Sequence, residues 1–143
     1  MPPFGENLGH YRILEKVGEG GMGEVYRARD QHLERDVAIK VLPEGLLGDD
    51  LARRHFHKEA LALSKLNHPN IEIVYDFDRQ DGLDFLVMEF IPGTTLSEKI
   101  EIGPLREADI VQLGLQLAEG LTAAHDHGVV HCDLKPANLR ITP

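Results

Sequence analysis

The sequence has little of what disulfide-bonded, zinc-binding or membrane-spanning proteins require. It contains one cysteine, Cys132, so no disulfide bond can form within the chain and no zinc site can be built from several cysteines. No apolar run approaches the ~18 residues that a membrane-spanning helix needs. The N-terminus also lacks the basic start and apolar core of a signal peptide. These absences predict a protein of the reducing cytoplasm, with no membrane span in the residues seen.

Basic residues are also scarce relative to acidic ones. The 143 residues include 24 Asp and Glu against 15 Lys and Arg, which gives a formal net charge of −9. Nucleic-acid binding needs a basic face that neutralises phosphates, and anionic lipid likewise attracts basic segments. The charge therefore argues against nucleic acid as a partner and gives no reason to expect a membrane surface. The length suffices for one domain with a sizeable core.

The most informative stretch is a short polar segment near the C-terminus, at 131–138, which reads HCDLKPAN. Its Asp133, Lys135 and Asn138 supply a base, a cation and a neutral oxygen ligand within one loop. Phosphoryl transfer needs such a set, because one group must orient the attacking hydroxyl, one must hold phosphate charge and one must hold a metal. The segment therefore predicts phosphoryl transfer.

A glycine-rich segment at 18–23 lies between two predicted strands, 11–17 and 24–29. The residues after the glycines alternate with period two, so the helix that a dinucleotide-binding fingerprint requires is not expected. A glycine-rich hairpin can lie over nucleotide phosphates, since backbone N–H groups approach closely where no β-carbon intervenes. An ordinary hairpin turn fits this segment, taken alone, equally well.

A third predicted strand, 36–42, carries Lys40 inside an apolar run, and a predicted helix follows from Asp49 or Asp50 to about residue 66. Glu59 falls on the helix face of Phe56 and Leu63, where an unpaired carboxylate would be costly to bury. We therefore expect Glu59 to pair with Lys40. The alternatives are a Lys40 whose ammonium group reaches solvent at the sheet edge, and a solvated Glu59.

The remaining segments predict two further strands, 71–77 and 83–90, and then a hinge at Ile91-Pro92-Gly93. A short helix capped by Thr94 or Thr95 should follow, and a long helix should span 105–127. The apolar girdle of the long helix is so wide that we expect partners on several sides. His125 and His127 would diverge by about 200° at its end, which argues against a shared metal ion.

The order of these features is a glycine loop, VAIK, a helix with an inward glutamate, HPN, a hinge, a buried helix and HCDLKPAN. In this order the sequence resembles the protein kinase family, and most closely the bacterial serine/threonine kinases. The resemblance covers residues 9–142. It implies an α+β, protein-kinase-like fold. A complete N-terminal lobe, made of a five-stranded antiparallel sheet and one helix, would precede the first part of a helical C-terminal lobe. The expected division is a leader at 1–8, the N-terminal lobe at 9–90, the hinge at 91–94 and the start of the C-terminal lobe at 95–143.

The resemblance also implies ATP and Mg²⁺ as cofactors and a protein with Ser or Thr as the substrate. Asp133 would orient the substrate hydroxyl and accept its proton, Lys135 would stabilise the transferring phosphate, and Asn138 would bind one magnesium ion. Lys40 would hold the α- and β-phosphates and pair with Glu59. The other implied ATP contacts are the loop residues Gly18, Gly20, Gly23 and Val25, Ala38 beside adenine, Met88 at the back of the pocket, and hinge backbone groups from Glu89 to Ile91.

Two residues depart from the family pattern. Cys132 stands where an arginine usually precedes the catalytic aspartate and pairs with a phosphate on the activation loop. A neutral thiol cannot make that pair, so control by activation-loop phosphorylation is not expected. We interpret Cys132 as a small buried side chain rather than a redox site. Arg140 falls where the family usually has an apolar floor for adenine, although its stem can still cover the ring.

The D-F-G motif, whose aspartate holds the bridging magnesium ion, does not occur in these 143 residues. We therefore expect the chain to be the front part of a kinase domain, whose long helix exposes a large apolar patch. The first hypothesis is a serine/threonine phosphotransferase that is inactive as this isolated piece. The alternative is a truncated, catalytically dead kinase that binds nucleotide or a protein partner. The sequence names neither the substrate, the upstream signal nor the oligomeric state.

Overall fold

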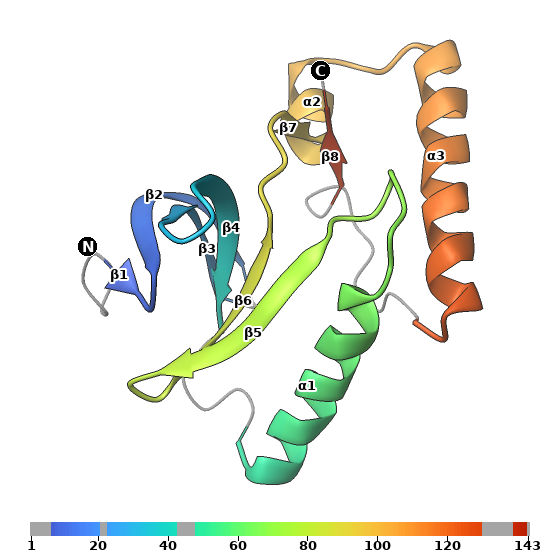
Figure 1. Cartoon of the computed structure of the whole chain (residues 1–143). Coiled ribbons are helices and arrows are strands. Elements are labelled where there is room, and N and C mark those ends of the chain that lie inside the picture. Colours follow the sequence, from blue (N-terminus) through green and yellow to red (C-terminus); the bar gives the residue numbers. More distant parts are fainter. Residues whose placement is uncertain (1–6, 21–22, 43–47, 130–138, 143) are drawn as a thin grey trace. The chain divides into compact units, whose positions relative to one another are not determined.

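The computed structural model describes residues 7–20, 23–42, 48–129 and 139–142. The chain forms two compact units (Figure 1). The first comprises Met1–Lys65 and Ile73–Phe90, and the second comprises Leu66–Glu72 and Ile91–Pro143. The segment Leu66–Glu72 thus belongs to the second unit, whereas the sequence analysis placed it in the N-terminal lobe.

The first unit contains an antiparallel sheet with the strand order β1-β2-β3-β4-β6-β5 (Figure 1). Its strands are β1 (Asn7–Leu8), β2 (Tyr11–Gly20), β3 (Gly23–Asp30), β4 (Arg35–Val41), β5 (Val74–Gln80) and β6 (Leu83–Glu89). The five longer strands agree with the predicted sheet. The sixth, β1, pairs Leu8 with Tyr11, and Leu8 is fully buried. Asn7 and Leu8, which the sequence analysis assigned to the leader, thus belong to this sheet.

The two faces of this sheet carry different side chains because successive residues of a strand point to opposite sides. One face holds the main apolar core, built from alternate residues of four strands together with β1, namely Leu8, Tyr11, Tyr26, Ala28, Val37, Ile39, Val41, Phe85 and Val87. On the other face, α1 (Asp50–Ser64) packs over β5 and β6 through a second cluster of Ala60, Val74 and Leu86. Asp49 caps α1, as predicted, and accepts a hydrogen bond from the Ala52 N–H at 2.8 Å.

The turn between β3 and β4 depends on Asp30, a residue that is only 2% exposed. Its Oδ1 accepts hydrogen bonds from the backbone N–H groups of His32 and Leu33 at 2.9 and 3.0 Å. Burial raises the pKa of the Asp30 carboxyl. The two hydrogen bonds and the nearby positive charges lower it by more than burial raises it, so the pKa lies below its ordinary value. The turn is thus held by an ionised, almost inaccessible carboxylate.

The second unit contains α2 (Leu96–Ile102), α3 (Glu107–Asp126) and a two-stranded ladder of β7 (Thr94–Thr95) and β8 (Arg140–Ile141). Thr95 caps α2, as expected, and accepts a hydrogen bond from the Glu98 N–H at 3.1 Å. Gly93 has a φ of +126°, and a β-carbon there would collide with the carbonyl oxygen of Ile141. Glycine is therefore required at the entry to this ladder.

The long helix α3 does not have the several-sided burial that its apolar girdle predicts. Within this helix, which is described in full, the buried residues are Gly120 and Ala124. Ile110, Val111 and Leu115 are 54%, 57% and 61% exposed. The expected exposed apolar patch is thus confirmed. Among the helices described here, none is long and apolar enough to cross a membrane.

Asp30→Ala should lower the free energy of unfolding at pH 7 by about 1–3 kcal/mol, because the backbone N–H groups of His32 and Leu33 lose a charged acceptor. The folded state lowers the carboxyl pKa, so this stabilisation is complete above the unfolded value of about 3.9 and disappears as the pH falls through the folded value. Urea unfolding followed by circular dichroism at pH 7 and pH 3 tests this. Asp78→Ala, at an exposed site on β5, is the control. A pH-independent difference would contradict the assignment.

Gly114 and Gly120 of α3 should respond differently to alanine. A β-carbon at Gly120 would lie 3.2 Å from the Asn70 carbonyl oxygen, whereas one at Gly114 would meet no described atom within 4 Å. Gly114→Ala should therefore raise the free energy of unfolding by up to ~1 kcal/mol through helix propensity. Gly120→Ala should gain less or lose stability, because Asn70 must shift. Equal gains in chemical denaturation would show that α3 does not approach Asn70.

Candidate functional site

Four of the predicted ATP-contacting residues lie together on one face of the sheet. Gly18 pairs with Val25 across β2 and β3, and Val25 pairs with Lys40 across β3 and β4. Directly paired residues point to the same side of an antiparallel sheet, as do residues two apart on one strand. Gly18, Val25, Ala38 and Lys40 therefore share a face, which we call the β2–β4 face. It lies opposite the main core, to which the alternate residues Tyr26 and Ile39 belong.

The described glycines form the paired ends of strands β2 and β3 on this side of the sheet. A β-carbon added at Gly18 would lie in ordinary contact, 3.8 Å, with the Val25 Cβ. Glycine at this position therefore keeps the space beside Val25 free of a side chain. Gly23 has a φ of +121°, which favours glycine, and it pairs with Gly20. Residues 21 and 22, at the tip, lie outside the described part of the chain.

Val17 is a candidate site residue that sequence reasoning missed. The pairing of β2 with β3 shifts by one residue between Lys16 and Gly18, so that Val17 lies in a β-bulge. This residue is 36% exposed, although it is apolar, and it immediately precedes the first glycine. A bulge changes the direction of a side chain in ways that a regular alternation does not predict. The available signal was the apolar residue next to the glycine segment.

The predicted position of Glu59 is wrong. The residues of α1 that pack towards the sheet are Phe56, Ala60 and Leu63, whereas Glu59 is exposed. Among the described residues, the structure places no ion pair between Glu59 and Lys40. Lys40 itself is half-buried on β4, in register with Leu86 of β6. The strand lysine thus lies on the predicted face, but Glu59 is not its partner there.

The end of β6 is fixed from both sides of the strand. Met88 pairs with Ala38 on β4, and on the other side it pairs with Val74 on β5. The Glu89 N–H donates to the Ile73 carbonyl oxygen at 2.8 Å, and Glu89 Oε1 accepts from the Ile73 N–H at 3.1 Å. Met88 and Glu89 therefore lie beside Ala38, as the expected adenine slot requires. Ile91, the other predicted hinge contact, belongs to the second unit.

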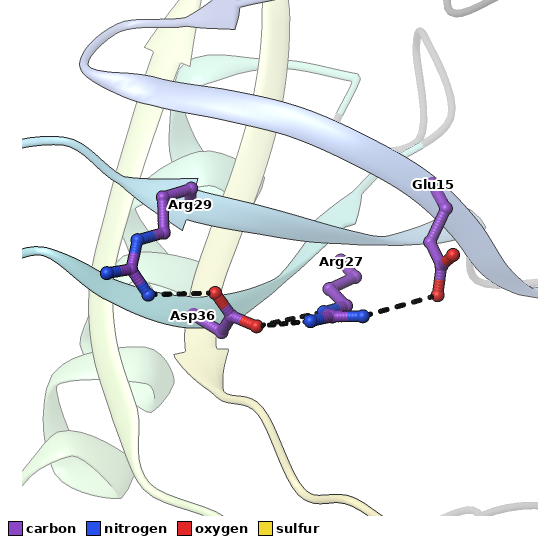
Figure 2. A network of polar contacts seen from close by, with 4 residues as sticks. All are labelled: Glu15, Arg27, Arg29 and Asp36. Carbon is purple, nitrogen blue, oxygen red and sulfur yellow. Dashed lines mark hydrogen bonds and ion pairs between the residues drawn. The ribbon is translucent and has the colours of Figure 1, made fainter.

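An ionic network occupies the same face beyond Ala38 (Figure 2). Nε and Nη2 of Arg27 donate to Asp36 Oδ2 at 2.9 and 2.6 Å, and Nη1 lies 3.9 Å from Glu15 Oε1. Arg29 Nη1 donates to Asp36 Oδ1 at 3.1 Å. The hydrogen bonds from Arg27 and Arg29 hold the pKa of the Asp36 carboxyl below its ordinary value. The Asp36 carboxylate therefore stays ionised at neutral pH.

The predicted catalytic residues Asp133, Lys135 and Asn138 lie outside the described residues, and so does Cys132. Their roles stay predictions. The described part of the chain has no group of three or more His, Cys, Asp or Glu residues that could hold a metal ion. The Arg140 guanidinium donates to the Gly93 carbonyl oxygen at 3.1 Å, so it joins the ends of the β7–β8 ladder.

The first unit thus combines an antiparallel sheet, a glycine hairpin, a lysine on the same face of the sheet and a packed helix. This combination is typical of domains that bind nucleotide phosphates under a glycine-rich loop. Residues 11–142 match the protein kinase domain family, and the chain belongs to this family. The predicted family and fold are thereby confirmed.

Similar proteins include bacterial serine/threonine-protein kinases. The chain is 40% identical to PrkC of Bacillus subtilis over 134 residues, which cover 93% of the chain and 21% of PrkC. It is 42% identical to pkn3 of Myxococcus xanthus over 135 residues, which cover 93% of the chain and 25% of pkn3. The chain thus spans about a fifth to a quarter of these relatives.

A solved structure, the crystal structure of the Mycobacterium tuberculosis PknI kinase domain, superposes with a TM-score of 0.87 at 28% sequence identity. The superposition covers 99% of this chain and 58% of the PknI chain. The likeness therefore extends over both units of the described fold.

Glu59→Gln should change the free energy of unfolding by no more than about 0.5 kcal/mol, because an exposed carboxylate contributes little. A buried carboxylate paired with Lys40 would instead cost about 3–5 kcal/mol when the pair is broken. Chemical denaturation of the unliganded chain distinguishes the two. Lys58→Gln, at the neighbouring exposed position on α1, controls for a change of surface charge. A loss of several kcal/mol for Glu59→Gln alone would restore the predicted pair.

Proposed function

We propose that this chain is the nucleotide-holding part of a serine/threonine protein kinase that transfers the γ-phosphate of ATP to a protein hydroxyl. The observation that carries the proposal is the β2–β4 face, which brings an open glycine surface, two small apolar side chains and a lysine onto three neighbouring strands. The names of the bacterial relatives support the choice of serine/threonine kinase.

Along this face, the residues suited to the base come first and those suited to the phosphates follow. Val25 and Ala38 offer apolar surface to a flat base, and the end of β6 brings backbone groups next to Ala38. The exposed Val17, next to the first glycine, can add to this surface. Lys40 is two residues further along β4, roughly 7 Å away at about 3.4 Å per residue. It therefore places an ammonium group on the glycine-hairpin side, where phosphates would lie. ATP supplies the transferable phosphoryl group, and Mg²⁺ neutralises charge that develops on it.

The second half of the proposed chemistry belongs to the loop at 131–138. Asp133 orients the substrate hydroxyl and accepts its proton, and Lys135 holds negative charge on the transferring phosphate. Asn138 offers an amide oxygen to one magnesium ion, a ligand type that suits a hard cation. These roles follow from the kinase family to which the chain belongs, together with the residue types in the loop.

A second candidate is a non-catalytic module that binds nucleotide or a protein partner. The apolar residues Ile110, Val111 and Leu115 on the surface of α3 favour it, since exposed apolar patches commonly mark interaction sites. The two candidates differ in turnover. The kinase predicts Mg²⁺-dependent consumption of ATP with phosphate transfer to a protein once the rest of the kinase domain is present. The module predicts nucleotide or partner binding without turnover even then.

In a complete kinase domain that contains this chain, Lys40→Met should abolish Mg²⁺-dependent phosphate transfer, with kcat/KM falling at least about 100-fold, because no other described residue of the β2–β4 face places a cation beside the glycine hairpin. Transfer of radiolabelled γ-phosphate to a Ser/Thr protein measures activity, and circular dichroism verifies the fold. Lys58→Met, on the exposed surface of α1, is the matched control and should retain full activity. An active Lys40→Met domain would refute the assigned role, and a complete wild-type domain that binds ATP without turnover would favour the module.

A further inference from the structure

The ionic network around Asp36 lies on the face that we propose to hold the nucleotide. Arg27 is the register partner of Ala38, and Arg29 is the partner of Asp36, two residues before Ala38. Arg27 is also two residues from Val25, so its side chain starts from the β2–β4 face. Figure 2 shows its guanidinium between the carboxylates of Asp36 and Glu15. The network therefore borders the proposed adenine slot.

Arg27 is the member of the network that also reaches the end of β6. Its Cζ lies 5.1 Å from the centroid of the Phe90 ring, in cation–π geometry. Phe90 directly follows Glu89, which forms the last register pair of β4 with β6, Val37 with Glu89. The ladder thus ends one residue before Phe90. Beyond the end of the ladder, the contact with Arg27 links the Phe90 side chain to the β2–β4 face.

The Arg27 guanidinium can contact a carboxylate and an aromatic ring at the same time. Its N–H groups point out from the edge, and its flat face stays free to lie over a ring. Nε and Nη2 of Arg27 both donate to Asp36 Oδ2, and these charge-assisted hydrogen bonds hold one edge of the group. The flat face is then left for an aromatic ring. With its donors directed to carboxylates, Arg27 is not placed to bind phosphate as a ligand. Its contacts instead restrain the neighbouring Phe90.

We propose that Arg27 is a positioning residue for ATP. Anchored by Asp36, it holds Phe90 and thereby the end of β6 against the β2–β4 face, and this sets the place of the backbone groups that meet adenine relative to Ala38. The inference rests on the proposed ATP site. Arg27 acts through Phe90 and does not touch the reacting atoms.

The chain provides a matched control in Arg29. It donates to the same carboxylate, Asp36 Oδ1, and carries the same charge as Arg27. The described aromatic contact with Phe90, however, belongs to Arg27. Arg27→Leu and Arg29→Leu therefore remove the same charge and each take one partner from Asp36. A difference between them in nucleotide affinity reports the contact with Phe90 and not the loss of a positive charge.

The experiment is isothermal titration of the whole chain with ATP, and separately with adenosine, in the presence of Mg²⁺. Arg27→Leu should weaken ATP binding about tenfold, equivalent to ~1.4 kcal/mol, and should weaken adenosine binding by the same factor, because the base is what is mispositioned. Arg29→Leu should stay within about twofold of wild type. The double variant Arg27→Leu/Phe90→Leu should bind no more weakly than Arg27→Leu, since both changes remove one contact.

Equal affinities for the wild type and Arg27→Leu would overturn the inference while leaving the proposed function intact. Equal losses in Arg27→Leu and Arg29→Leu, or a loss confined to ATP, would also overturn it, because charge and not position would then be the cause. A wild-type chain without ATP affinity would instead refute the proposed function. If Arg27→Leu fails to fold, Phe90→Leu provides the test. It removes the ring and keeps the ion pairs, and the same tenfold loss is expected.

Discussion

The pairing of β3 with β4 is the constraint on which the rest of the structure depends. Val25 lies opposite Lys40 on the β2–β4 face, and the next pair, Tyr26 and Ile39, lies on the core face of the sheet. A slip of one residue would carry Lys40 into the apolar core and expose Ile39. The cost of burying an ammonium group there makes this register specific. The same hydrophobic pattern that builds the core thus assembles the β2–β4 face.

A β-bulge and a glycine next to it add to the β2–β4 face where strand β2 departs from regular pairing. The bulge at Val17 exposes an apolar side chain beside the glycines, and Gly18 leaves the surface next to Val25 uncovered. On the far side of Ala38, the ion pairs of Arg27 and Asp36 border the end of β6. Apolar surface for a base, a lysine and a glycine hairpin therefore follow one another along a single face. This order is what a nucleoside triphosphate requires.

Much of this fold could be predicted from the sequence because its signals are local. Period-two alternation located the long strands, and the caps Asp49 and Thr95 marked helix starts by their own chemistry. The strand β1 was missed because it has only two residues, too few to show an alternation of apolar and polar side chains. The exposed apolar surface of α3 was predicted because the chain offers too few apolar segments to cover a helix with so wide an apolar surface. Glu59 was misplaced because 56, 59 and 63 share a helix face almost as well as 56, 60 and 63. Only packing against the sheet decides between the two phases. The contact of Arg27 with Phe90 joins residues 63 positions apart, which local periodicity does not reveal.

The central claim is that the β2–β4 face holds ATP with its phosphates at Lys40. It is tested most directly with an ATP analogue that carries an acyl group on its γ-phosphate, because a lysine amine next to the phosphates displaces ATP and becomes acylated. Mass spectrometry of the digested chain then identifies the labelled lysine. The account predicts labelling of Lys40, alone or with Lys135, that excess ATP suppresses. Labelling mainly at the other lysines, Lys16, Lys58, Lys65 and Lys99, or labelling that ATP does not suppress, would contradict it.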